Sequence, residues 1–164
     1  MSEQNPYAPP GADVAVSESQ DLAERGTRLG GAIIDGLLLA GLIWAFVFAS
    51  GIWSRMVEQS NTVTDTVLIF LVSVGAFLLL NGYLLAKHGQ TIGKRLLNMR
   101  IVSVQDGRIL PFWRVMALRY LPVWVIGYIP LVGSVFSLVN PLFIFREDRR
   151  CVHDLIAGTR VVKA

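Results

Sequence analysis

The stretch that decides the fold is residues 29–53, LGGAIIDGLLLAGLIWAFVFASGIW, in which the single charged residue is Asp35. About 20 helical residues cross the hydrocarbon core of a bilayer, so a helix of this length spans it with some tilt. Residues 66–86 form a second apolar stretch of sufficient length, and they contain no charged residue. The sequence therefore predicts two full membrane-spanning helices.

The overall composition also indicates a membrane protein. Of the 164 residues, 53% are hydrophobic and 16% are charged, against about 25% charged in an average soluble domain. The net charge is +3, but the basic residues lie beside the apolar stretches, which is typical of cytoplasmic flanks and not of a nucleic-acid-binding surface. Cys151 is the single cysteine, and no metal-binding or nucleophile–base pattern occurs. We therefore expect no enzymatic activity, cofactor, metal site or nucleic-acid partner.

The third apolar stretch, residues 115–145, is long for one span and short for two. Proline and glycine interrupt it at Pro122, Gly127, Pro130, Gly133 and Pro141. Irregular backbone at membrane depth is tolerated only where protein or water surrounds it. The pattern favours a helical hairpin or short helix pair, and one long tilted span is the alternative.

The distribution of charge predicts the orientation. The loop 87–114 carries six basic residues against Asp106, whereas residues 54–65 carry one. Under the positive-inside rule, the loop 87–114 and both termini are cytoplasmic. Residues 1–24 are acidic and proline-containing, without a periodic apolar pattern, which predicts a disordered cytoplasmic tail before a membrane domain over 25–164.

The cytoplasmic part of the chain has β-strand character. Residues 99–104 and 108–110 flank Asp106-Gly107, a pattern typical of a β-hairpin, and residues 159–162 are suited to a third strand. The predicted fold is thus an all-α polytopic membrane protein, with two full transmembrane helices, a Pro/Gly-broken helical hairpin and a small cytoplasmic antiparallel β element.

Asp35 is the main candidate functional residue. An aspartate within a membrane span costs roughly 2.5–3.5 kcal/mol, so it is expected to face other helices and to find a partner. Arg28, seven positions earlier, shares its helix face, and Arg119 in the third stretch is another potential partner. Two interpretations are open: Asp35 titrates or binds a cation, or it clamps helices together.

Other polar and small residues support this region. Asn81 and Asn140 are suited to bond across helices or to line a path. Ala32, Gly36 and Ala40 form a close-packing stripe, within the subunit or between subunits. The segment 89–95, GQTIGKR, lacks the spacing of a phosphate-binding loop. Its Thr91 is predicted to cap a short amphipathic helix at the membrane surface.

Three blocks of this sequence resemble the RDD family of bacterial membrane proteins, named for one arginine and two aspartates. They are residues 28–35, RLGGAIID, residues 89–97, GQTIGKRLL, and residues 153–159, HDLIAGT. The resemblance covers residues 25–164 and makes Arg28, Asp35 and Asp154 the name-giving residues. It implies a bacterial inner-membrane protein with a cytoplasmic N-terminus, in a family for which transport, including cation/proton exchange, has been suggested.

The expected function is that of a small inner-membrane transporter exchanging a small monovalent cation for a proton. Asp35 would bind the ion or proton, Arg28 would tune it, and Asp154 would gate it or brace the tail. Because one chain has too few helices to enclose a pathway for an ion, we expect a homo-oligomer in the lipid bilayer. The alternative is a non-transporting membrane assembly or interaction protein in which these residues are structural.

Overall fold

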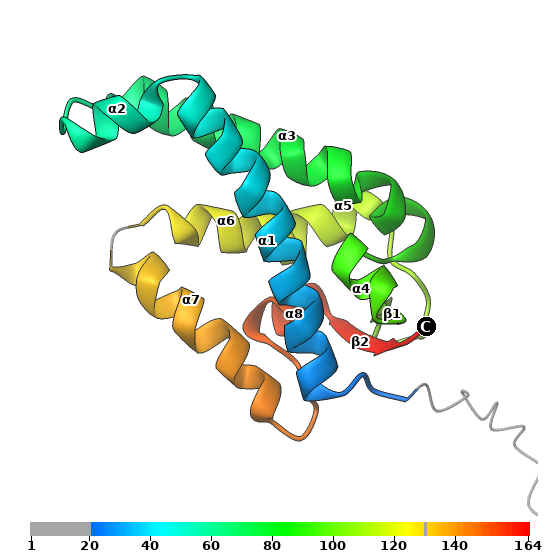
Figure 1. Cartoon of the computed structure of the whole chain (residues 1–164). Helices are drawn as coiled ribbons and strands as arrows, with labels where there is room; N and C mark the ends of the chain where they lie inside the picture. The colour runs from blue at the N-terminus through cyan, green and yellow to red at the C-terminus, as the bar shows by residue number, and fades with distance from the viewer. Residues whose placement is uncertain (1–20, 130) are drawn as a thin grey trace, which may run out of the picture.

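A computed structural model of the chain describes residues 21–129 and 131–164 (Figure 1). The described part is mainly helical and contains one small two-stranded sheet. Most of the predicted disordered tail, residues 1–20, lies outside the described residues. Its last four residues run beside the sheet, where Leu22 bridges Val162 and Ala23 is buried.

The first helical hairpin is formed by α1 (Arg25–Ala49) and α3 (Val63–His88), joined through the short helix α2 (Ile52–Val57). The helix α3 begins with a capping box, in which Thr62 and Asp65 each accept the other's backbone N–H. Both α1 and α3 are long and apolar enough to cross a membrane. Large apolar side chains such as Leu37 and Leu79 are 69% and 88% exposed, as lipid-facing residues are in an isolated chain.

A short connection leads from α3 into the sheet. Gly89 ends α3 in the left-handed conformation, with φ 64°, and α4 (Ile92–Leu96) follows with Thr91 as its predicted cap. Strand β1 (Met99–Ser103) pairs antiparallel with β2 (Thr159–Lys163), so that Ile101 lies opposite Val161. The predicted small antiparallel β element is therefore present.

The β-hairpin predicted around Asp106-Gly107 is wrong, because the described residues 108–110 do not form a strand. On the edge of β1 that faces away from β2, Ile101 already donates its N–H to the carbonyl of Gly89. Along this edge Arg108 accepts one bond, from the N–H of Ser103. Pro111, which has no N–H, then precedes the next helix. The partner of β1 is the C-terminal strand.

The second hairpin occupies the third apolar stretch, as the proline and glycine pattern predicts. Its outgoing arm is one helical run made of α5 (Phe112–Val115), a π-helical turn η1 (Met116–Tyr120) and α6 (Leu121–Gly127). Its returning arm is α7 (Val132–Leu142) with a 3₁₀ turn η2 (Phe143–Phe145). At about 1.5 Å per residue each arm is shorter than the roughly 30 Å hydrocarbon core. The last helix, α8 (Val152–Ala157), precedes β2.

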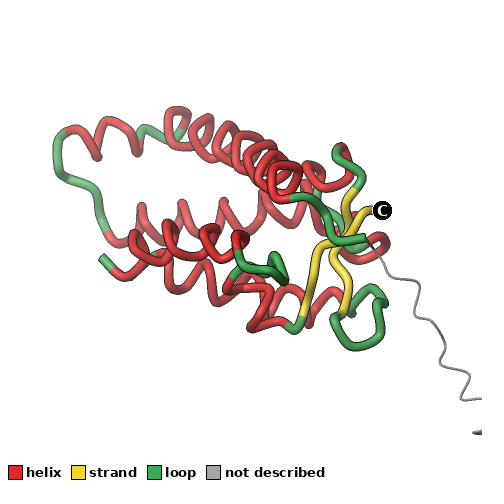
Figure 2. The backbone as a smooth tube through the Cα atoms, turned by 90° about the horizontal axis from the view of Figure 1, so that it is seen from below, coloured by secondary structure: helices red, strands yellow, loops and turns green. Residues whose placement is uncertain are grey.

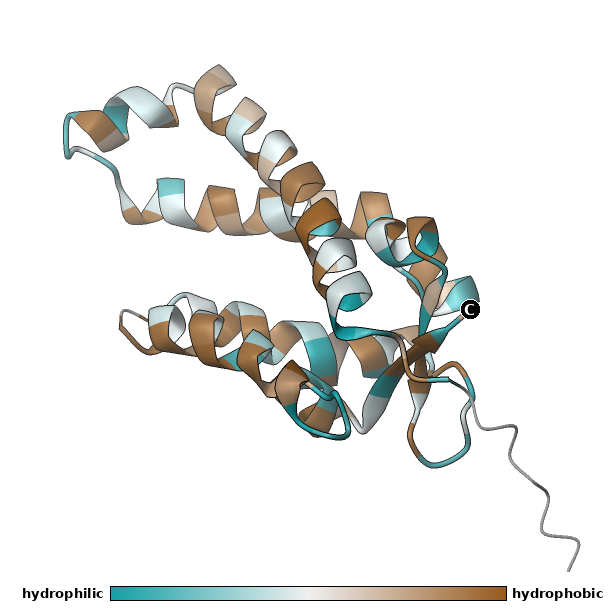
Figure 3. Cartoon of the chain, turned by 60° about the horizontal axis from the view of Figure 1, so that its bottom comes forward, coloured by the Kyte–Doolittle hydropathy of each residue, from teal (hydrophilic) through white to brown (hydrophobic). Residues whose placement is uncertain are grey.

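Both hairpins extend in the same direction from the end that carries the sheet (Figures 2 and 3). The buried apolar core lies at the sheet end and includes Leu85, Ile101, Val115 and Val161. Phe77 of α3 contacts the rings of Tyr120 and Trp124, which joins the two hairpins. The polar groups described next lie between this core and the arms.

Candidate functional site

Asp154 joins four elements through its carboxylate. Oδ2 accepts a bond of 2.5 Å from Arg28 Nη2 of α1 and one of 3.1 Å from the N–H of Cys151. Oδ1 accepts from Arg119 Nη1 of η1 and, at 3.1 Å, from Thr159 Oγ1 of β2. Asp154 is fully buried. Its two oxygens thus accept four protein hydrogen bonds, and we name Arg28, Arg119 and Asp154 the clamp.

The electrostatics keep the clamp ionised. Burial alone would raise the pKa of Asp154, but the guanidinium groups of Arg119 and Arg28 hold it well below its usual range. Burial and the nearby Arg119 lower the pKa of His153 to about 3, so this imidazole is neutral near pH 7. A carboxylate held in this way takes up neither a proton nor a free cation at neutral pH.

His153 is positioned by a residue of the second hairpin. Its Nδ1 lies 2.9 Å from Oδ1 of Asn140, and because an amide oxygen only accepts, this contact assigns the ring proton to Nδ1. Cys151, His153 and Asp154 have potential ligand atoms within 4.8 Å of one another. However, the Asp154 oxygens are occupied and two arginines lie beside them, so this donor set is poor for a metal cation.

The arginines at the start of α1 also hold the C-terminal loop. Arg28 Nη1 donates to the carbonyl of Arg149. Arg25 donates to the carbonyls of Ile144, Phe145 and Arg146, which end the returning arm. Cationic side chains at a helix C-terminus satisfy carbonyls that have no partner within the helix. Arg28 and Arg25 therefore join α1 to the end of the second hairpin.

Asp35 lies in a second polar cluster, against α4. Its Oδ2 accepts a bond of 2.5 Å from Thr91 Oγ1, and its Oδ1 accepts one of 2.7 Å from the N–H of Gly93. Lys94 Nζ lies 3.8 Å from Oδ2. The side chains of Asp35 and Lys94 are 17% and 13% exposed, unlike that of Asp154, at 0%. We name Asp35, Thr91 and Lys94 the Asp35 cluster.

Polar residues of both long helices cap α4. Asn81 of α3 accepts the N–H of Ile92 at 2.9 Å, next to the N–H of Gly93 that Asp35 accepts. These N–H groups are among the first of the helix and have no partner within it. Gly31 and Gly93 permit the approach, because a Cβ on Gly93 would lie 2.2 Å from the carbonyl oxygen of Gly31. The GQTIGK segment is thus a docking element for α1 and α3.

Lys94 is surrounded by charges from several elements. Burial and Arg119 lower its pKa, Asp35 and Asp154 raise it, and Arg28 lowers it, with a result of about 8. An ordinary lysine has a pKa of about 10.4. Lys94 therefore releases its proton closer to neutral pH than an ordinary lysine does.

The structure separates residues that were expected to act together. Within the described residues, Arg28 and Arg119 pair with Asp154, and the expectation that either is the partner of Asp35 is wrong. Seven helical residues separate Arg28 from Asp35 by about 10 Å, which their side chains do not close. Asn81 and Asn140 both bond across elements, as one interpretation predicted.

The small-residue stripe is largely uncovered by the described residues. Ala32 and Gly36 are exposed, Ala40 is half-buried, and a Cβ on Gly36 would meet nothing within 4 Å among the described residues. Packing of the stripe against a second subunit stays a prediction. Sequence reasoning did not single out Lys94, Thr159 or Arg25 as site residues. Of these three, only Lys94 could have been found from the sequence, because it lies three residues after Thr91, the predicted cap of a short helix.

Two apolar helices long enough to cross a membrane, with buried arginine–aspartate contacts at their sheet end, define a membrane-type helical protein. The sequence model of the RDD family matches residues 22–158, and the chain belongs to this family. It is similar to "Uncharacterized protein YckC" of Bacillus subtilis (strain 168), with 27% identity over 140 residues that cover 84% of this chain and 82% of that protein. No solved structure matches the chain.

Proposed function

We propose that this protein is a multi-pass protein of the bacterial inner membrane that exchanges a small monovalent cation for a proton at Asp35 and Lys94. The observation that carries the proposal is the Asp35 cluster. It pairs a partly exposed carboxylate, within a helix of membrane-spanning length, with a partly exposed lysine 3.8 Å away. Intramembrane ionisable residues are functional candidates by default.

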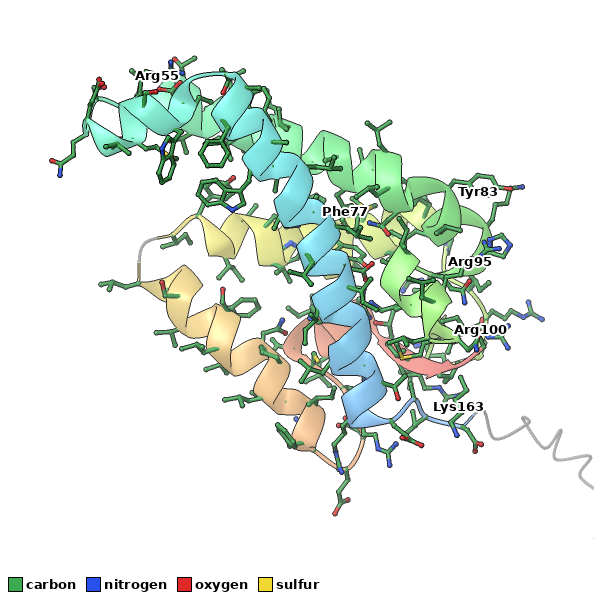
Figure 4. All side chains as sticks on the ribbon, viewed as in Figure 1. Arg55, Phe77, Tyr83, Arg95, Arg100 and Lys163 are labelled. Atoms are coloured by element: carbon green, nitrogen blue, oxygen red, sulfur yellow. The ribbon has the colours of Figure 1, made fainter. Side chains whose placement is uncertain are left out.

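The orientation with both termini in the cytoplasm is part of the proposal. Arg95, Arg100 and Lys163 lie together at the sheet end, whereas Arg55 lies at the far end of the first hairpin (Figure 4). Both hairpins run away from this basic end (Figure 2). An excess of arginine and lysine is typical of the cytoplasmic side. Aromatic rings of Trp44, Phe48 and Trp53, typical of a membrane interface, contact one another near the opposite end.

The exchange follows from charge balance. Lys94 in its protonated form neutralises Asp35, and its Nζ also donates to Thr91 Oγ1 at 3.4 Å. When Lys94 loses its proton, the carboxylate is left without a counter-charge, and oxygen atoms of Asp35 and Thr91 become available to a small cation. Hard oxygen ligands suit such ions. One cation replaces one proton, and the net charge of the cluster is unchanged.

The clamp has a different role in this proposal. Because Asp154 accepts four hydrogen bonds and is fully buried, it holds the C-terminal segment to α1 and η1 and carries no ion. The chain offers few helices to enclose a path, so we propose that copies associate, with the exposed stripe at Ala32 and Gly36 as the contact.

One observation favours a second function. Asp35 and Asn81 both cap α4, which is a sufficient structural reason for two polar residues in apolar helices. If this is their whole role, the protein is a non-transporting membrane assembly or interaction protein.

A transport assay separates the two functions. We expect purified wild-type protein in proteoliposomes with an imposed pH gradient to dissipate the gradient when Na⁺, K⁺ or Li⁺ is added. Asp35→Asn, which keeps the shape of the side chain, should lower the rate at least tenfold because the counter-charge for the cation is gone. Arg95→Gln, an exposed charge removal on the same helix as Lys94, is the matched control and should exchange at the wild-type rate.

The result decides between the proposals. If correctly folded wild-type protein gives no cation-dependent flux, the transport proposal is wrong and the assembly function is favoured. If flux occurs and is unchanged in Asp35→Asn, the protein transports but Asp35 is not its ion site.

A further inference from the structure

We propose that Arg100 and Arg160 form a binding site for a phosphate group on the face of the β1–β2 sheet opposite the apolar core. The proposal is independent of the Asp35 cluster and the clamp, which lie on other elements. It rests on the strand register, on two buried donors without an acceptor, and on the absence of a counter-charge among the described residues.

The register places both arginines on one face of the sheet. Arg100 is opposite Val162, and Val102 is opposite Arg160, so the two arginines are diagonal neighbours on adjacent strands. Diagonal positions on one face have Cβ atoms about 7–8 Å apart, within reach of long side chains. The other face carries Met99, Ile101 and Val161, which belong to the apolar core. The arginines therefore lie on the face opposite this core.

The two arginines lie beside apolar side chains of the sheet and close to other basic residues. Val102 and Val162, their cross-strand partners, are 1% and 0% exposed, so the arginine stems lie beside buried apolar side chains. Arg100 and Arg160 themselves are half-buried. Arg100 lies near Lys163 and Arg95 at the sheet end (Figure 4). Anionic groups are attracted to a surface of this kind.

Each arginine carries a buried donor that lacks a partner in the described part of the chain. Nε of Arg100 and Nε of Arg160 are buried and have no hydrogen-bond acceptor among residues 21–129 and 131–164. Leaving a buried donor without an acceptor is costly, and such groups are uncommon in folded proteins. Two instances in neighbouring arginines of one sheet face indicate that an acceptor completes this surface.

No counter-charge among the described residues neutralises the pair. Within residues 21–129 and 131–164, the ion pairs use other basic residues, and neither Arg100 nor Arg160 forms one. Two like charges at neighbouring positions repel each other. A phosphate group removes this repulsion and offers several acceptor oxygens, and the planar guanidinium matches its geometry through paired hydrogen bonds.

The phosphate is either a free phosphate or the headgroup of an anionic lipid, since both present the same oxygens. In the proposed orientation the sheet lies at the cytoplasmic end, beside the exposed apolar Leu96 of α4, where a headgroup is accessible. The experiment distinguishes these two sources.

We would measure the thermal unfolding of the full chain in nanodiscs. One arm uses neutral phosphatidylcholine and adds inorganic phosphate, with chloride at equal ionic strength as the reference. The other arm compares neutral discs with discs containing phosphatidylglycerol. A rise in unfolding temperature in the first arm identifies free phosphate, and a rise in the second identifies a lipid headgroup. Either supports the site if Arg100→Gln with Arg160→Gln abolishes the rise.

The controls keep the test specific. Arg108→Gln with Arg114→Gln removes the same charge from exposed positions outside the site, and the rise should persist. Arg100→Lys keeps the charge and the long aliphatic stem, so it replaces the double variant in this test if the double variant does not fold. It should weaken the apparent affinity for phosphate at least threefold. The proposal is overturned if the wild type shows no rise in either arm, if the rise persists in the double variant Arg100→Gln with Arg160→Gln, or if Arg100→Lys leaves the apparent affinity unchanged.

Discussion

Asp154→Ala is expected to lower the free energy of unfolding by about 3–5 kcal/mol, because it leaves two buried arginines without their counter-charge. Arg28 and Arg119 are 8% and 3% exposed, and both donate to this carboxylate. A loss of this size is a large fraction of the 5–15 kcal/mol that typically stabilises a folded domain. It would release α8 and β2 from α1 and η1.

Cys151 provides a direct measurement. It is the single cysteine of the chain, it is 7% exposed, and its Sγ lies 4.0 Å from Arg28 Nη2. Burial raises the pKa of its thiol, so a maleimide should label the wild type slowly. We expect at least tenfold faster labelling in Asp154→Ala. Asp148→Ala, at a carboxylate with 37% side-chain exposure in the same loop, is the control, and equal rates in both variants would contradict the clamp.

Gly93→Ala is expected to disrupt the docking of α4 on α1. The added Cβ would lie 2.2 Å from the carbonyl oxygen of Gly31 and 3.0 Å from the carboxylate of Asp35. Backbone atoms cannot move aside as a flexible side chain does, so the loss should reach or exceed the roughly 1–3 kcal/mol typical of overpacking. Because α4 carries Thr91 and Lys94, cation-driven flux should fall together with stability.

Gly36→Ala is the matched control for this substitution. It lies on the same helix as Gly31, and its added Cβ would meet nothing within 4 Å among the described residues. The unfolding temperatures of the two variants are compared in detergent micelles that keep the protein monomeric, so that subunit contacts do not contribute. Equal unfolding temperatures for wild type and Gly93→Ala would contradict the close approach of the two helices.

The apolar pattern of the sequence predicts the helices well. Lengths of apolar chain identify α1 and α3, and the proline and glycine positions predict that the third stretch turns back. The β-hairpin prediction failed for a reason that no local pattern contains. The edge of β1 is occupied by Gly89 and its partner strand comes from residues 159–163, so the outcome depends on contacts between distant segments.

The partners expected for Asp35 were wrong. Helical periodicity places Arg28 and Asp35 on one face, which says nothing about the segments that approach that face. In the structure α8 brings Asp154 to Arg28, and α4 brings Thr91 and Lys94 to Asp35. Local sequence could not single out Lys94, because its burial depends on the close approach of α4 to α1 at Gly31 and Gly93.

The pH dependence of exchange in proteoliposomes tests most directly whether Lys94 carries the proton. Since Lys94 is protonated below a pKa of about 8 and neutral above it, we predict that wild-type flux rises as the pH increases through this value. Lys94→Arg keeps the positive charge but cannot release a proton near this pH, so it should not exchange, whereas the control Arg95→Lys should follow the wild-type profile. If the Lys94→Arg variant exchanges at the wild-type rate and with the wild-type pH profile, this result would contradict exchange at Asp35 and Lys94.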